Sequence, residues 1–241
     1  SKKDQVMGHA GLATLAAQAV EALQTGGATG EIKVLVDDSL FSGPALNPAW
    51  EPGDVAAGEV APVYSMALNS ARYDPAVTTG PRPQDAAMTA AEEFAAGLRS
   101  AGAAAGLTVA AAVERLPQPA AGTTAPARPE GEGTSQPVVL GEVQSATVAE
   151  QVNLMLQDSD NYLAEALGRL TALADGLPGS YDGATAAVGA QLAAAGLAAE
   201  GMKLVDVCGL AMGNQVPARQ FSEVVRAITS GTDTRLRSAL D

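Results

Sequence analysis

Apolar residues in the first half of the chain follow helical spacing in two stretches, and each stretch is followed by a run typical of a strand. Between residues 12 and 23 the spacing predicts a helix that ends at Gly26-Gly27. The β-branched residues at 32–36 then predict a strand. A helix over 83–102 and a strand over 107–113 repeat this order. Two helix-strand units in succession predict an α/β module in the first part of the chain.

The remaining segments are predicted as loops and helices. Residues 42–58 are rich in proline and predict a loop, and residues 117–137 predict a long surface connection because their composition cannot bury enough apolar area to fold. Helices are expected near 147–156, at 162–173, near 184–195 and at 218–228, and the last has an amphipathic pattern. A short strand is expected at 202–205. The expected fold class is therefore α/β (α+β), and the second half is mostly helical.

One polar triplet, Ser159-Asp160-Asn161, interrupts the helical half. A hydroxyl and a carboxamide two positions apart at a helix junction can donate a proton and orient an amide carbonyl, which indicates acyl transfer. The alternative is an ordinary helix cap, because Ser, Asp and Asn all accept hydrogen bonds from the free backbone N–H groups at helix starts. On pattern alone the cap is favoured.

The residues after the triplet carry a family resemblance. Ser159-Asp160-Asn161 continues as Tyr-Leu-Ala-Glu-Ala-Leu, and the stretch resembles the second signature of penicillin-recognising serine peptidases. It is similar to the D-alanyl-D-alanine carboxypeptidase/endopeptidase branch, the class C low-molecular-mass penicillin-binding proteins with inserted domains. Softer likenesses lie at 36–50, 61–69 and 206–214, and the last departs from the family pattern at Val207, Cys208 and Ala211. The resemblance runs from about residue 11 to residue 228.

This resemblance implies a domain division, a site and partners. Residues 1–142 would be an inserted α/β module ending in the Pro/Gly-rich connection, and 143–241 part of the penicillin-binding, transpeptidase-like domain. Ser159 would belong to a proton-transfer network with two lysines, Asn161 would bind the peptide carbonyl of the substrate, and Asp160 receives no catalytic role. The implied partners are peptidoglycan stem peptides, with β-lactams as inhibitors, and no cofactor or metal is implied. The implied location is extracytoplasmic, exported or associated with the cell envelope.

Two signatures of this family are missing. Its acylated serine stands in Ser-x-x-Lys, where the lysine lies one helical turn from the hydroxyl. Lysines occur here only at positions 2, 3, 33 and 203, and none stands three residues after a serine or begins Lys-Thr-Gly. We therefore expect an inactive fragment of a serine-type D-Ala-D-Ala carboxypeptidase. The alternatives are a non-catalytic protein that kept the fold and binds cell-wall peptides, and an unrelated hydrolase with a chance Ser-Asp-Asn.

Composition narrows the partners further. The formal net charge of −13 repels the phosphates of nucleic acid, so no nucleic-acid partner is expected. No apolar run approaches the roughly 20 residues that span a bilayer. Aromatic residues make up only 3% of the chain, so Ala, Val and Leu must fill the core. The single cysteine excludes an internal disulfide.

The other candidates for chemistry are interpreted as structural. Asp37 and Asp38 end a predicted strand, where neighbours point to opposite faces, so they are not expected to form a metal or acid/base pair. His9, the only histidine, is expected to be solvated, which disfavours a Ser-His-Asp triad. Cys208 has no nearby histidine or lysine in sequence to lower its pKa and is expected to pack as a small buried side chain. Residues 179–183 are expected to form a turn.

Overall fold

The structure, a computed structural model, describes residues 6–117, 137–197 and 199–230 of the 241-residue chain. These residues form two compact units, and each is described by itself. The first unit draws on residues 1–40, 65–68 and 85–146, and the second on 41–64, 69–84 and 147–241. Residues 41–64 and 69–84, which the boundary at residue 142 assigns to the inserted module, therefore pack within the second unit. How the two units correspond to the family's domains stays a prediction.

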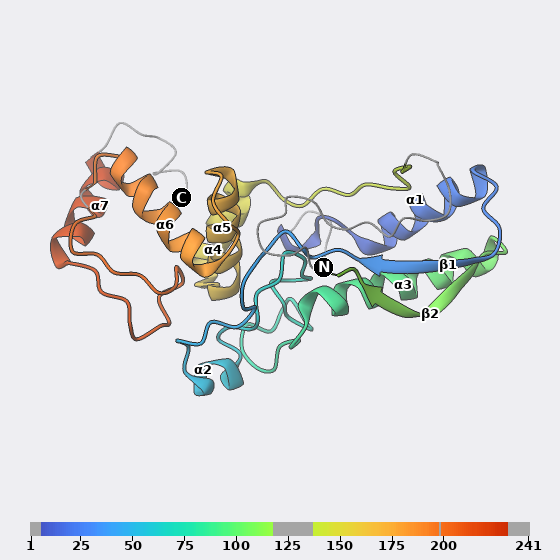
Figure 1. Cartoon of the computed structure of the whole chain (residues 1–241), viewed down its shortest axis with the longest axis horizontal. Helices are drawn as coiled ribbons and strands as arrows, with labels where there is room; N and C mark the ends of the chain where they lie inside the picture. Colours follow the sequence, from blue (N-terminus) through green and yellow to red (C-terminus); the bar gives the residue numbers. More distant parts are fainter. Residues whose placement is uncertain (1–5, 118–136, 198, 231–241) are drawn as a thin grey trace. The chain divides into compact units, whose positions relative to one another are not determined.

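Two helix-strand pairs build the first unit (Figure 1). After a short 3-10 helix (Val6–Gly8), the elements are α1 (Leu12–Thr25), β1 (Glu31–Val36), α3 (Ala86–Ala104) and β2 (Thr108–Arg115). The two strands pair in parallel, with a register shift between Ile32 and Val34. A parallel pair needs a crossover connection, and α3 lies in it. The α/β module predicted from the apolar pattern is confirmed.

Small side chains fill the core of the first unit. One cluster of its buried apolar residues consists of Ala16, Ala19, Val20, Val34, Ala95 and Leu98. Helices α1 and α3 approach closely, since a Cβ added at Gly97 would lie 3.4 Å from the Cβ of Ala16. Close packing of alanine and valine replaces the aromatic area that the composition lacks.

The second unit is helical. Its helices are α2 (Pro52–Ala57), α4 (Val148–Asp158), α5 (Asn161–Ala174), α6 (Tyr181–Ala194) and α7 (Ala218–Ser230). Side chains fix the starts of three of them by accepting hydrogen bonds from backbone N–H groups: Thr147 at α4, Asp160 at α5 and Ser180 at α6. The four long helices lie at the positions expected from the sequence, apart from the start of α6. The amphipathic pattern of α7 is strongest, with Phe221 and Val225 exposed in the described structure.

Three local expectations were wrong. Residues 52–57 form α2 inside the expected loop, because Pro52 suits the first turn of a helix. Residues 202–205 form no strand, and only a single antiparallel bridge joins Lys203 to Gln215. Helix α6 begins at Tyr181 instead of residue 184, because the Ser180 hydroxyl caps it, so 179–183 is a helix start and not a free turn. Most of the expected connection at 117–137 lies outside the described residues.

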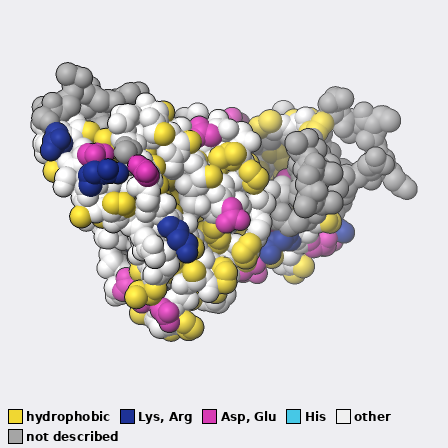
Figure 2. All heavy atoms as spheres, turned by 60° about the vertical axis from the view of Figure 1, so that its left-hand side comes forward, with side chains coloured by type: hydrophobic (Ala, Val, Ile, Leu, Met, Phe, Trp, Pro, Cys, Tyr) yellow, Lys and Arg dark blue, Asp and Glu magenta, His cyan; other side chains and the backbone are white. Residues whose placement is uncertain are grey.

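Charges are sparse and mixed on the face shown in Figure 2. Lysine and arginine side chains there are few and interspersed with acidic ones. Lysine and arginine do not gather into a basic patch among the described side chains drawn on this face, and the absence of a nucleic-acid partner stays a prediction. None of the helices within the described ranges has both the length and the apolarity needed to cross a membrane.

Candidate functional site

Ser159 and Asn161 flank the junction of α4 and α5. Ser159 follows the last residue of α4 with its backbone in the left-handed region (φ 52°, ψ 46°) and its side chain exposed. Asn161 is the first residue of α5 and is half-buried. Its Nδ2 donates a hydrogen bond to the carbonyl oxygen of Glu59 at 3.1 Å. The structure places the hydroxyl and the carboxamide at one helix junction, and their catalytic roles stay predictions.

The first turn of α5 is tied to residues 59–64. Besides the Asn161 contact, the Tyr162 hydroxyl accepts a hydrogen bond from the backbone N–H of Tyr64 (3.1 Å) and donates one to its carbonyl (3.4 Å). Burial raises the pKa of Tyr162 to about 12, so the phenol stays neutral and can do both. The side chains of Asn161 and Tyr162 are thereby both held to residues 59–64.

Asp160 lies between the two candidate residues and is almost fully buried, with 2% of its surface exposed. One carboxylate oxygen caps α5 by accepting from the backbone N–H of Leu163 at 3.0 Å. The other accepts from Nη1 of Arg72 at 2.8 Å and forms a buried ion pair. The capping alternative is therefore correct for Asp160. Arg72 stands 88 residues earlier in the chain, and no sequence signal linked the two.

A left-handed turn positions Arg72. Asn69, Ser70 and Ala71 have φ of 52°, 52° and 55°, and the backbone N–H of Arg72 donates to the carbonyl of Asn69 at 3.1 Å. Residues other than glycine enter this region at a cost of roughly 1–2 kcal/mol each. Three in a row are maintained only where surrounding contacts hold them. The chain thus stores strain immediately before the arginine that binds Asp160.

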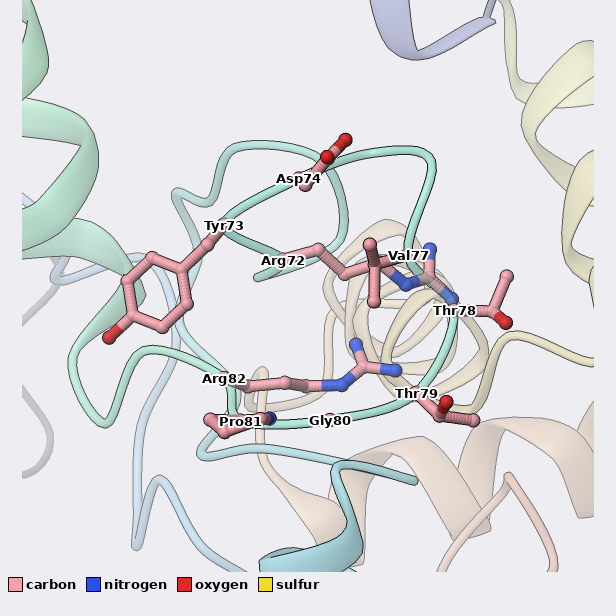
Figure 3. Close-up of a pocket in the computed structure, with 9 residues that line it drawn as sticks. All are labelled: Arg72, Tyr73, Asp74, Val77, Thr78, Thr79, Gly80, Pro81 and Arg82. Carbon is pink, nitrogen blue, oxygen red and sulfur yellow. The ribbon is translucent and has the colours of Figure 1, made fainter.

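Arg82 lies beside Arg72. Its Nε donates to the carbonyl of Gly58 and its Nη1 to that of Ser70 at 2.8 Å, so it fastens the turn. Burial lowers the pKa of Arg82, and the neighbouring charge of Arg72 lowers it further. Figure 3 shows the two guanidinium groups side by side, where with residues 73–74 and 77–81 they line a cavity of about 250 Å³.

A second buried acid, Glu165, connects α5 to residues 206–214. It is fully buried, and its Oε1 accepts from the backbone N–H groups of Val207 (2.8 Å) and Cys208 (2.9 Å). Its Oε2 has no hydrogen-bond partner among the described residues. Burial raises the pKa of Glu165, and the two backbone hydrogen bonds only partly oppose this. One turn further along α5, buried Arg169 lies 4.0 Å from the ring centroid of Tyr181.

Asp206 is the hub of the 206–214 segment and is 1% exposed. The donors to its carboxylate are Trp50 Nε1 at 2.8 Å, Gly209 N at 2.9 Å, Ala211 N at 2.7 Å and Asn214 Nδ2. Burial acts to raise its pKa, but these hydrogen bonds outweigh burial and leave the pKa below the usual value. Residues 206–214, one of the segments with a softer family resemblance, therefore form a loop folded around the carboxylate of Asp206.

The departures from the family pattern in this loop do not disturb the hub. Ala211 replaces a serine but supplies its backbone N–H to Asp206. Cys208 is half-buried, and its Sγ lies 3.4 Å from an oxygen of Asp206. Burial and the carboxylate of Glu165 raise the pKa of Cys208, so the thiol stays protonated. An inert cysteine agrees with the structural interpretation made from the sequence.

Glu165, Asp206 and Cys208 also form the one cluster of possible metal ligands among the described residues, with ligand atoms within 4.8 Å of one another. Both oxygens of Asp206 and Oε1 of Glu165 accept hydrogen bonds from N–H groups, which a cation would repel. A protonated thiol is a poor ligand as well. The donor set fits a loop anchor better than a metal centre.

Glu165→Gln tests the charge of this anchor. Because the pKa of Glu165 is raised in the folded state, the stability it contributes is present below the usual value of 4.5 and is lost as pH rises through the folded pKa. Glutamine keeps an oxygen for the two N–H groups and does not ionise. We expect the variant to gain stability relative to wild type between pH 4 and pH 8, measured by urea unfolding at each pH. Parallel stability curves would contradict a buried, titrating Glu165.

The remaining candidates lie as the sequence predicted. Asp37 is exposed and accepts from the hydroxyl and N–H of Ser39, whereas Asp38 is buried and pairs with Arg115 at 3.1 Å. His9 is exposed.

Comparisons with known proteins agree with one another. The model of the D-Ala-D-Ala carboxypeptidase 3 (S13) family matches residues 1–111 and 84–239. Carboxypeptidase DacB of Mycolicibacterium smegmatis is 35% identical over 209 residues, which are 87% of this chain and 41% of that protein. Carboxypeptidase Rv3627c of Mycobacterium tuberculosis is 33% identical over 222 residues, or 92% of this chain and 43% of that protein. The chain spans less than half the length of these relatives.

The fold also matches a solved structure. Penicillin binding protein 4 (dacB) from Haemophilus influenzae superposes with a TM-score of 0.61 at 19% identity, covering 92% of this chain and 58% of that chain. At this identity the likeness shows the fold alone. It confirms the predicted α/β class with a mostly helical second half.

Proposed function

Because the chain belongs to the D-Ala-D-Ala carboxypeptidase 3 (S13) family, as its motifs predicted, we propose that it is part of a longer serine-type D-Ala-D-Ala carboxypeptidase/endopeptidase, here called the parent protein. Its substrates are peptidoglycan stem peptides, β-lactams inhibit it, and it acts outside the cytoplasm. The observation that carries this proposal is the Ser159-Asp160-Asn161 junction, with an exposed hydroxyl, a buried acid and an anchored amide. Family membership disfavours an unrelated hydrolase.

The proposed reaction passes through an acyl-enzyme. A serine hydroxyl attacks the carbonyl carbon between the two terminal D-alanines, the last D-alanine leaves as the amine, and water then hydrolyses the ester. Ser159 relays the proton that the departing amine takes up, for which its hydroxyl must be exposed. Asn161 binds a peptide carbonyl of the substrate with its second Nδ2 hydrogen, because the first is bonded to Glu59.

The acylated serine is proposed to lie outside these 241 residues. No Ser-x-x-Lys or Lys-Thr-Gly occurs in the sequence. The matched relatives are more than twice as long as the part that this chain covers. This chain supplies one wall of the site, and alone it should not turn over substrate.

Release of D-alanine from a diacyl-Lys-D-Ala-D-Ala peptide tests this function. The parent protein should release D-alanine and the 241-residue chain should not. In the parent, Ser159→Ala or Asn161→Ala should lower kcat/KM by about 10²–10³-fold, the usual effect of removing a proton-transfer group or a preorganised amide donor. Ser222→Ala, an exposed hydroxyl on α7, is the matched control and should leave the rate unchanged. Release by the isolated chain would contradict the proposed place of the nucleophile.

A second candidate function is non-catalytic binding of cell-wall peptides. The missing Ser-x-x-Lys favours it, because a chain that kept the fold without the nucleophile can still hold a peptide through Asn161. Calorimetric titration of the 241-residue chain with a stem peptide measures this directly. Binding by the chain, together with no D-alanine release by any longer form isolated from the source, would favour this alternative.

A further inference from the structure

We propose that Arg72 and Asp160 form a positioning pair that sets the geometry of Ser159 and Asn161, an inference that rests on the proposed function of those two residues. Neither Arg72 nor Asp160 need touch the substrate. They act through the backbone, because Asp160 is bonded covalently to both candidate residues.

The pair is rigid. Nη1 of Arg72 and the oxygen of Asp160 lie 2.8 Å apart, and their side chains are 6% and 0% exposed. The second oxygen of Asp160 is bonded to the N–H of Leu163. Both oxygens therefore have fixed partners, one on α5 and one on the loop at 72. Rotation of the carboxylate would break at least one of them, so the backbone at 159–161 has one favoured placement.

A helix cap alone does not require this ion pair. The starts of α4 and α6 in the same unit are capped by the neutral hydroxyls of Thr147 and Ser180. Burying an arginine and a carboxylate carries a desolvation penalty that often cancels their attraction. A neutral hydroxyl would suffice to cap α5, so the buried charge of Asp160 is not explained by helix stability. We infer that its role is to place the backbone of Ser159 and Asn161.

Strained backbone lies on both sides of the pair. Residues 69–71 precede Arg72 in a left-handed turn, and Ser159, which precedes Asp160, has φ of 52°. Such conformations persist where surrounding contacts determine them and recur at functional sites. The ion pair joins these two segments, and Arg82 fastens the first by its bond to the carbonyl of Ser70. Release of Arg72 would leave both free to relax, which would move the Ser159 hydroxyl.

Acylation of the parent protein by a slow chromogenic β-lactam tests the pair. In Arg72→Ala and Asp160→Ala, the first-order acylation constant should fall about 10²-fold, as expected for a displacement near 1 Å, while the concentration for half-maximal rate changes little. Arg72→Lys should keep more activity than Arg72→Ala. Arg115→Ala, which removes ion pairs of the first unit, is the control and should acylate like wild type.

Chemical rescue separates positioning from general damage. Arg72→Ala leaves a space that opens onto the cavity lined by residues 72–74 and 77–82. Millimolar methylguanidinium should therefore restore at least a tenth of the wild-type constant in Arg72→Ala, and should not act on Asp160→Ala, which lacks the partner carboxylate. If Arg72→Ala does not fold, Arg72→Lys supplies the comparison with Asp160→Asn.

The outcomes distinguish this inference from the proposed function. Wild-type acylation in folded Arg72→Ala and Asp160→Ala, with slow acylation in Ser159→Ala, would overturn the positioning pair only. Equal rescue of both alanine variants would overturn it too. Wild-type acylation in Ser159→Ala would instead overturn the proposed role of Ser159.

Discussion

Asp206→Asn should destabilise the second unit by about 3 kcal/mol, one of the two largest effects expected in this chain. The carboxylate is buried and accepts hydrogen bonds from Trp50, Gly209, Ala211 and Asn214. Asparagine would turn an N–H₂ group toward at least one of these donors, which leaves both groups unsatisfied. The 206–214 loop would then lose the centre around which it folds.

Urea unfolding followed by tryptophan fluorescence measures this effect. Trp50 is the only tryptophan and its indole N–H is bonded to Asp206, so the signal reports the affected contact. Asp175→Asn is the matched control, because the Asp175 side chain is exposed and accepts hydrogen bonds from Gln191 Nε2, and the change should alter stability by less than about 0.5 kcal/mol. Equal urea midpoints for Asp206→Asn and Asp175→Asn would show that the hydrogen bonds to the Asp206 carboxylate do not stabilise the second unit.

Gly58→Ala should also destabilise the second unit, again by about 3 kcal/mol. Gly58 ends α2 at φ 80°, where a Cβ costs roughly 1–2 kcal/mol. That Cβ would lie 1.7 Å from the carbonyl oxygen of Gly80, so the backbone must move, which adds about 1–3 kcal/mol. The movement would part residues 57–58 from the loop at 80–82, where Gly80 N donates to Ala57 and Arg82 to Gly58.

Gly53→Ala provides the control for this prediction. Gly53 lies inside α2 with nothing within 4 Å of an added Cβ, and alanine favours helix by about 1 kcal/mol over glycine. Thermal unfolding should show an unchanged or higher midpoint for Gly53→Ala and a much lower one for Gly58→Ala. A Gly58→Ala midpoint within a degree of wild type would contradict the close approach at Gly80.

Local pattern predicted the elements of the fold well. The sequence pattern predicted α1, α3 and α5, each of which buries one face in its own unit, and it also predicted α4, α7 and the two parallel strands. No residue of α4 is fully buried, and Phe221 and Val225 of α7 are exposed. The short helix α2 was missed since a six-residue helix shows no periodicity. The expected strand at 202–205 was wrong because a run of four residues cannot show whether a pairing strand exists, and here Lys203 forms a single bridge with Gln215.

The site was predicted only in part, for a different physical reason. Ser159 and Asn161 were found from a contiguous motif. Arg72, whose ion pair reaches Asp160 from 88 residues away, carries no local signal. Asp206 stood in a recognised segment, but its role depends on Trp50, which lies 156 residues earlier. Long-range contacts of buried charges are fixed by tertiary packing, and neither spacing nor composition records them.

Intact-mass spectrometry of the parent protein during brief exposure to benzylpenicillin tests the role of Ser159 and Asn161 most directly. Wild type should gain the mass of one penicilloyl group, and Ser159→Ala and Asn161→Ala should gain it about 10²-fold more slowly or less while unfolding at the same urea concentration as wild type. Adduct formation by both variants at the wild-type rate, or the absence of any adduct on wild type, would contradict the proposed site.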